Sequence, residues 1–191
     1  MTQEILSTYK AAFDELNILT QATYLQSAGD KKKVSDDFLS FLINAYLLGT
    51  QTVSKMLNTD LKPNVDRMDE VIYLMIDGKT FEDRVAEHMN ADDLSGLQTL
   101  AESEYHRVFN AAEKDGADSY RNSTGLQVVK KWITMLDDKV RATHDYLEGA
   151  EVALDEEFFT YDGDHAPYPG GFEKAENNVN CRCFIDYTVG L

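Results

Sequence analysis

The sequence is poor in the features that mark secreted and membrane proteins. It has three prolines and only two cysteines among its 191 residues. With two cysteines it lacks the disulfide framework that small secreted domains use. No apolar run approaches the roughly 18 residues that a membrane span requires, and the first residues lack the basic and apolar regions of a signal peptide. We therefore expect a soluble protein that is made in the cytoplasm and has no membrane partner.

Cationic side chains are also scarce. There are 18 Lys and Arg residues against 34 Asp and Glu residues, and the net charge is −16. Because nucleic-acid affinity arises mainly from cations that neutralise phosphates, we expect no broad DNA-binding surface. One local basic stretch could still contact DNA, although acidic residues interrupt it and a solvated face is the simpler interpretation; it comprises Lys130, Lys131, Lys139 and Arg141.

Motifs of the common enzyme classes are missing. The chain has no Gly-rich phosphate loop, no nucleophile elbow and no HExxH sequence, and these absences favour a non-enzymatic protein. One enzymatic alternative remains, in which a histidine and two cysteines bind a zinc ion that activates water. The His-x-Glu element of zinc deaminases is absent, however, and the cysteines are spaced as CxC instead of CxxC.

Helical periodicity dominates the first part of the chain, and 43% hydrophobic content allows a packed core. We predict a helix that begins at Ser35, a capping box formed by Thr80 and Asp83, and a long helix that ends near Gly116. The polar stripe of that long helix, with Asp93, Glu102 and Glu104, is interpreted as a solvated face. Residues 1–115 are therefore predicted to form a helical bundle.

The pattern changes after Gly125. Residues 127–134 and 183–189 are rich in β-branched and aromatic residues, which is typical of strands. We predict that residues 116–191 form a C-terminal module with a small antiparallel sheet and a short helix, and that Trp132 is the centre of its core. The fold class is thus α+β, with a mostly helical N-terminal part.

The C-terminal module also holds a set of potential metal ligands. A helix over residues 138–147 would place Val140, His144 and Leu147 on one inward face. Cys181 and Cys183 would project from one face of a strand, where a disulfide between them would be strained. The three side chains could bind a structural zinc ion with Asp137 or His165 as fourth ligand, or they could join helix and strand by packing and hydrogen bonds alone.

Several of these residues, taken in order, resemble a known family. The order is Trp132-Ile133-Thr134, then Asp137-x-x-Val140-Arg141-x-x-His144, Leu147-x-Gly149, a proline-containing loop, and Asn180-Cys181-Arg182-Cys183. This order and spacing resemble the phage Mu F-like minor head proteins, also called the phage head morphogenesis family. Residues 101–110 are similar to the helix that precedes the tryptophan segment in that family, and the resemblance covers residues 76–188.

The resemblance implies a virion protein of a tailed phage or prophage. It would be a minor capsid component near the portal vertex that acts in head assembly or DNA delivery, with the portal or major head protein as its partner. Relatives that carry this module upstream of a toxin domain suggest an alternative, namely an adaptor that escorts a separate effector into the particle.

Overall fold

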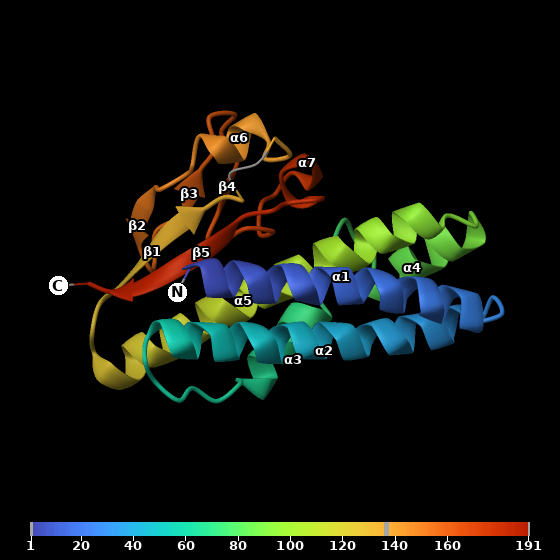
Figure 1. Cartoon of the computed structure of the whole chain (residues 1–191), viewed down its shortest axis with the longest axis horizontal. Coiled ribbons are helices and arrows are strands. Elements are labelled where there is room, and N and C mark those ends of the chain that lie inside the picture. The colour runs from blue at the N-terminus through green and yellow to red at the C-terminus, as the bar shows by residue number, and fades with distance from the viewer. Residues whose placement is uncertain (1, 136–137, 191) are drawn as a thin grey trace.

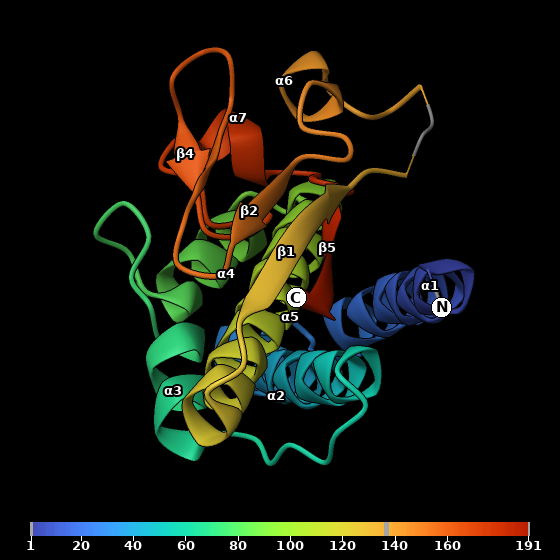
Figure 2. The same cartoon turned by 90° about the vertical axis from the view of Figure 1, so that its left-hand side faces the viewer.

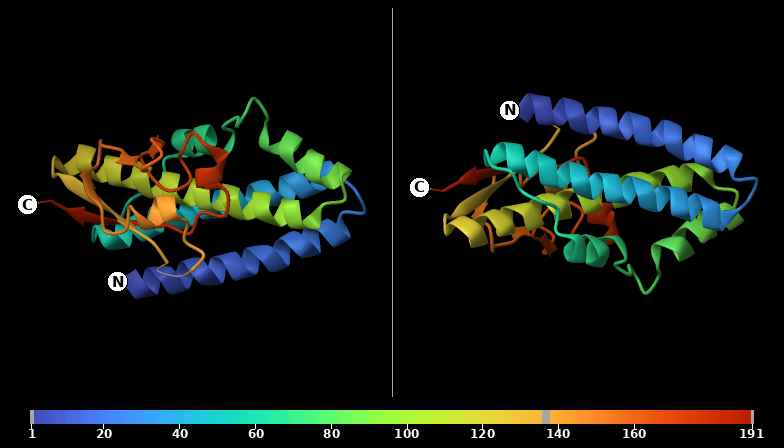
Figure 3. Two further views of the ribbon diagram at one scale, coloured as in Figure 1. Left: turned by 90° about the horizontal axis from the view of Figure 1, so that it is seen from above. Right: turned by 90° about the horizontal axis from the view of Figure 1, so that it is seen from below.

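Three long helices form the base of the structure. The computed structural model describes residues 2–135 and 138–190. Helix α1 (Thr2–Gln26) runs antiparallel to α2 (Lys31–Met56), and α5 (Leu94–Thr124) runs in the same direction as α2 (Figures 1 and 3). The shorter helices α3 (Val65–Ile72) and α4 (Phe81–Asn90) carry the chain back to the beginning of α5.

Polar side chains cap the helices of this layer. The capping box of α4 is confirmed, because Thr80 accepts a hydrogen bond from the Asp83 backbone and Asp83 accepts one from the Thr80 backbone. The predicted start of α2 at Ser35 is wrong. Asp30 is the cap, its carboxylate accepts a hydrogen bond from the Lys33 backbone, and Ser35 lies buried inside the helix.

Helix α5 is longer than predicted. Its expected end at Gly116 is wrong, because the helix continues to Thr124 and ends at Gly125, which adopts the left-handed conformation (φ 73°) typical of a C-terminal cap. Gly116 instead gives room to a neighbouring helix, since a Cβ atom there would lie 2.5 Å from a methyl carbon of Val53 in α2. The predicted boundary between residues 115 and 116 therefore falls within one continuous helix.

A small antiparallel sheet covers one end of the helical layer. Its order is β2 (Glu151–Ala153), β1 (Val128–Ile133) and β5 (Phe184–Val189), with Trp132 opposite Ile185 in the register. A separate hairpin joins β3 (Phe158–Phe159) and β4 (His165–Ala166), while α6 (Ala142–Asp145) and α7 (Ala175–Asn178) are single turns. Figure 2 shows the sheet stacked over α5, with α1 to one side.

The predicted α+β fold class is confirmed, and so are both predicted strands. Strand β2 was not predicted, since it has only three residues and neither its central residue nor its ends are buried. The predicted helix over residues 138–147 is reduced to the single turn α6. None of the described helices is long and apolar enough to cross a membrane.

Two clusters of buried side chains hold the layers together. The first lies among α1 to α5, and the second fills the C-terminal module around Trp132, which is confirmed as a fully buried core residue. The second cluster also contains Val53 and Met56 of α2 and Ala117 of α5. The sheet module therefore has no core separate from the helices, because the ends of α2 and α5 form one wall of it.

A buried carboxyl lies where α5 meets the sheet. Glu113 is fully buried, and neither of its carboxyl oxygens has a hydrogen-bond partner among the described residues. Burial raises the pKa of Glu113 well above its usual value, and the nearby Asp186 of β5 raises it further. The folded protein thus keeps this carboxyl protonated at a pH at which the unfolded chain ionises it.

This difference predicts a stability effect with a defined pH dependence. The unfolded chain loses the Glu113 proton near the usual glutamate pKa of 4.5, while the folded protein retains it. Ionisation therefore favours the unfolded state more strongly as pH rises, by about 1.4 kcal/mol per pH unit until the folded pKa is reached. Glu113→Gln should raise the Tm at pH 7 by at least about 2–4 °C, and thermal melts followed by circular dichroism should show the gain shrinking toward pH 4.

The matched control is Glu173→Gln, which changes an exposed carboxyl. It should leave the Tm unchanged at both pH values. A Glu113→Gln protein whose Tm relative to wild type is the same at pH 4 and pH 7 would contradict the assignment of a protonated carboxyl.

Candidate functional site

The structure brings together His144, Cys181 and Cys183. The Nδ1 atom of His144 lies 3.4 Å from the sulfur of Cys181 and 3.4 Å from the sulfur of Cys183. The three potential ligand atoms all lie within 4.8 Å of one another. The side chains are buried, with 1% of His144, 6% of Cys181 and 1% of Cys183 exposed. Both cysteines are free thiols.

Backbone contacts fix the two segments that supply these side chains. The Arg141 guanidinium, directly before α6, donates hydrogen bonds to the carbonyl oxygens of Glu176 and Val179. Asn180 then turns the chain with a positive φ of 54°, a conformation that asparagine tolerates well. The prediction that Cys181 and Cys183 lie on a strand is wrong, because both lie in the turn and short irregular segment that lead into β5. Both sulfur atoms nevertheless face His144.

Helix α5 holds the cysteine segment from the other side. The Nε2 atom of His106 lies 2.8 Å from the carbonyl oxygen of Cys183, at hydrogen-bond distance. His106 itself is packed closely, because a Cβ atom on Gly170 would lie 3.2 Å from its Nδ1 atom. Sequence reasoning missed His106, since its role depends on a contact between residues 77 positions apart in the chain.

Aromatic rings enclose the cluster. The His144 ring stacks on Phe172 with centroids 5.2 Å apart, and the edge of Trp132 meets it at 5.4 Å. Phe158 packs in turn against Trp132 at 5.1 Å. This shell separates the sulfur and nitrogen atoms from solvent and gives the site the low polarity of a protein core.

The two thiols differ in acidity. Burial raises the pKa of Cys183, and the neighbouring Cys181 raises it further. Burial also opposes ionisation of Cys181, but the hydrogen bond from Cys183 and the nearby histidines outweigh it and lower the pKa of that thiol well below its usual range.

The two residues predicted as a fourth ligand have different outcomes. His165 lies in β4, where its Nδ1 atom is 2.6 Å from a carboxylate oxygen of Glu157 and its ring packs on Phe159. It does not belong to the group of ligand atoms around His144. Asp137 lies outside the described residues.

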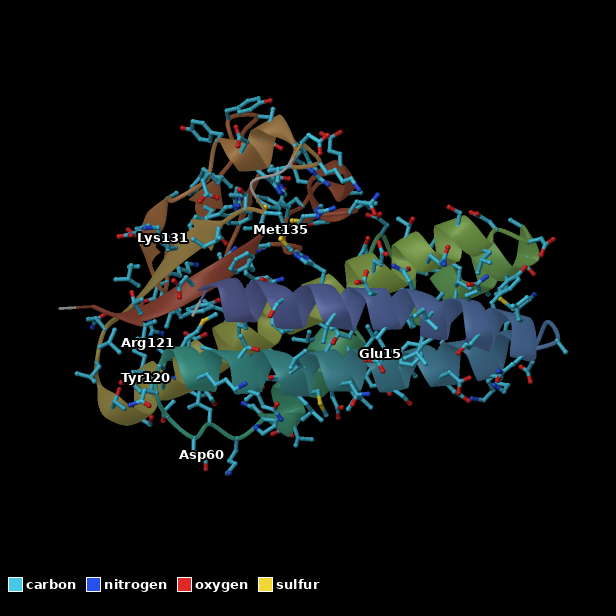
Figure 4. All side chains as sticks on the ribbon, viewed as in Figure 1. Glu15, Asp60, Tyr120, Arg121, Lys131 and Met135 are labelled. Atoms are coloured by element: carbon cyan, nitrogen blue, oxygen red, sulfur yellow. The ribbon has the colours of Figure 1, made fainter. Side chains whose placement is uncertain are left out.

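The predicted basic stretch does not form a basic surface. Lys130 is fully buried, donates a hydrogen bond to the Pro167 carbonyl at 2.8 Å, and has its pKa lowered to about 8 by burial. Lys131 points outward from β1 and pairs with Glu151 at 2.9 Å (Figure 4). Arg141 binds backbone carbonyls as described above. The prediction of a solvated face is therefore wrong for Lys130, whereas Lys131 is partly exposed and Lys139 is exposed.

The acidic stripe of α5 also differs from its prediction. Glu104 is buried instead of solvated, with one carboxylate oxygen 2.8 Å from Arg84 of α4 and the other 2.8 Å from Arg107. Arg107 also donates a hydrogen bond to the Val71 carbonyl at 2.9 Å. The sequence carries one signal of this ion pair: Glu104 and Arg107 are three residues apart, and such residues are neighbours on a helix.

A cavity of about 510 Å³ adjoins this buried ion network. Its walls come from α4, the first half of α5, and the segment of the C-terminal module around α7. Ser103, on the wall of the cavity, lies 3.4 Å from the backbone nitrogen of Asn180. The cavity therefore marks the junction between the helical layer and the segment that carries the cysteines.

Comparisons with known proteins identify the family to which this chain belongs. The profile of the family described as "Phage Mu protein F like protein" matches residues 69–186. The chain belongs to this family. The predicted resemblance is thereby confirmed, and the matched region contains β1, the turn α6 with His144, and both cysteines. Helices α1 and α2 precede the matched region.

This member of the Phage Mu protein F like family is similar to two curated proteins. It is 30% identical over 155 residues to NAD(+)--arginine ADP-ribosyltransferase EFV of Enterococcus faecalis, covering 78% of this chain and 31% of that protein. It is 31% identical over 96 residues to Minor head protein GP7 of Bacillus phage SPP1, covering 50% of this chain and 30% of that protein. The chain thus spans about a third of the length of these relatives. No solved structure matches it.

The buried network predicts a large loss of stability on removal of its carboxylate. Burial opposes ionisation of Glu104, but Arg107 and Arg84 outweigh it and lower its pKa. Glu104→Ala would leave two guanidinium groups without their counter-charge, which typically costs about 3–5 kcal/mol. We expect a Tm lower by roughly 10 °C at pH 7, measured by calorimetry.

The pH dependence and a control sharpen this prediction. A lowered carboxyl pKa stabilises the fold above the unfolded pKa, and this stabilisation is lost as pH falls through the folded pKa. The difference between wild type and Glu104→Ala should therefore shrink in acid. Glu70→Ala removes an exposed partner of Arg67 and should change the free energy of unfolding by less than about 1 kcal/mol. Equal losses in the two variants would refute the assignment.

Proposed function

We propose that this protein is a non-catalytic minor component of the head of a tailed phage or prophage, located at the portal vertex. It would act there in head assembly, in DNA delivery, or in both. The observation that carries the proposal is the family match over residues 69–186, together with 31% identity to a protein named as a minor head protein. The partners would be the portal protein and the major head protein.

The burial of the cysteine cluster supports a non-catalytic role. A metal ion that activates water needs an open coordination position that substrate can reach. His144 and Cys183 are each only 1% exposed, and aromatic rings cover them. The alternative of a zinc-dependent enzyme that uses His144, Cys181 and Cys183 is disfavoured for this reason.

The outer face of α1 is the docking surface that we favour. Ile18 is 68% exposed and Leu25 is 69% exposed, and their spacing of seven residues places them on the same side of the helix. Asp14 and Glu15, four and three residues before Ile18, are both exposed. Figure 4 shows Glu15 on α1. An apolar stripe beside carboxylates suits a helix of a portal or head subunit that carries apolar residues flanked by lysine or arginine.

The first experiment measures copy number. Particles from the producing strain should be purified, treated with nuclease and analysed by quantitative mass spectrometry, with the portal protein as internal reference. The proposal predicts a low and fixed ratio of this chain to the portal protein. Absence from the particles would overturn it.

The docking surface predicts a specific loss of incorporation. The double variant Ile18→Asp with Leu25→Asp should fold as wild type does, because both side chains are exposed, yet its copy number per particle should fall at least about tenfold. Leu126→Asp is the matched control, since Leu126 is an apolar residue that is 47% exposed outside α1. Normal incorporation of the double variant would exclude α1 as the docking surface.

The relation to ADP-ribosyltransferase EFV favours a second candidate function. A module that is 30% identical over 155 residues occurs within a larger protein named as an enzyme. The present chain would then escort a separate effector into the particle. Affinity purification of the tagged chain from disrupted particles distinguishes the two functions, because a scaffold should recover portal or head subunits and an escort should recover an effector.

A further inference from the structure

The distances in the cysteine cluster match those around a metal ion. Zinc binds sulfur at about 2.3 Å and histidine nitrogen at about 2.0–2.1 Å, so a tetrahedral angle separates the two donors by roughly 3.5 Å. The Nδ1 atom of His144 lies 3.4 Å from both sulfur atoms. Both sulfur–nitrogen distances in the cluster therefore match those of a zinc site.

Hydrogen bonding alone explains this arrangement less well. A neutral imidazole nitrogen is either an acceptor with one lone pair or an N–H donor, so Nδ1 makes one good hydrogen bond to one sulfur only. The second sulfur, at the same distance, would then interact with the neighbouring thiol but have no strong interaction with His144. A cation between the three atoms would satisfy both sulfurs and the nitrogen at once.

The charge balance also favours a divalent cation. Two thiolates and a neutral imidazole around one zinc ion give a net charge of zero, and such a group can be buried without a further counter-ion. The surroundings are apolar, because Trp132 and Phe172 pack directly on the His144 ring. Thiolate and imidazole donors favour zinc, whereas the harder cations magnesium and calcium prefer oxygen donors.

We propose that His144, Cys181 and Cys183 bind one structural zinc ion that joins α6 to the turn entering β5. The described residues supply three ligands, and the remaining position is left to a water molecule. This site goes beyond the proposed head function and does not depend on it.

The ion would stabilise the parts of the module that have least support of their own. Helix α6 is a single turn of four residues, which is too short to be stable in isolation. His144 and the cysteines are 37 and 39 residues apart in the chain. A zinc ion would link these distant segments directly, and its binding free energy would add to the stability of the fold.

Metal content of the full-length protein is the direct test. The chain should be produced in zinc-supplemented medium, purified without chelators and analysed by inductively coupled plasma mass spectrometry. We expect about one zinc ion per chain in the wild type. Cys181→Ser, Cys183→Ser and His144→Ala should each lose the ion. His165→Gln is the matched control, since His165 pairs with Glu157 outside the cluster, and it should retain zinc.

Two further measurements cover variants that fail to fold. Cobalt added to metal-free wild-type protein should produce the intense near-ultraviolet absorption of cobalt–thiolate bonds, and zinc should displace it. A strong chelator should lower the Tm of the wild type and leave that of Cys183→Ser unchanged. A metal-replete wild-type protein that contains no zinc and gives no cobalt–thiolate band would overturn the proposal, whatever the copy number in particles.

Discussion

The close contact between α2 and α5 is the constraint on which the rest of the structure depends. A Cβ atom on Gly49 of α2 would lie 2.4 Å from the carbonyl oxygen of Phe109, and Gly116 of α5 faces Val53 equally closely. Only hydrogen fits at both positions, so the two helices approach more closely than larger side chains permit. Their parallel course obliges α3 and α4 to return the chain to the start of α5, and it places the ends of α2 and α5 together beneath the sheet.

Helix α5 makes contacts with both parts of the structure. Its Glu104 holds Arg84 and Arg107 in a buried ion network within the helical layer, its His106 lies at hydrogen-bond distance from the carbonyl of Cys183, and Ala117 contributes to the core around Trp132. The His106 contact places the cysteine segment against α5 independently of any metal ion. Such a prepared position lowers the cost of bringing the ligands together.

The division between matched and unmatched regions has a physical counterpart. The family match covers the part of the chain with the sheet, the enclosed cysteine cluster and α5, where the charges of Glu104 and Lys130 are buried against fixed partners. Helices α1 and α2 precede it, and α1 carries the exposed residues Ile18 and Leu25. An exposed helix beside a closely packed module fits the docking role proposed above for α1.

The amino-acid sequence by itself determined the family, the α+β class, both long strands, the buried Trp132 and the grouping of His144 with the two cysteines. These follow from local periodicity, β-branched composition and the order of motif residues, which involve neighbours in the chain. Only the tertiary structure decided that Glu104 and Lys130 are buried, that Gly116 lies inside a helix, and that His106 holds the cysteine turn. Each of these depends on a partner far away in the sequence, and a one-dimensional pattern carries no information about which distant group will neutralise a charge or fill a gap.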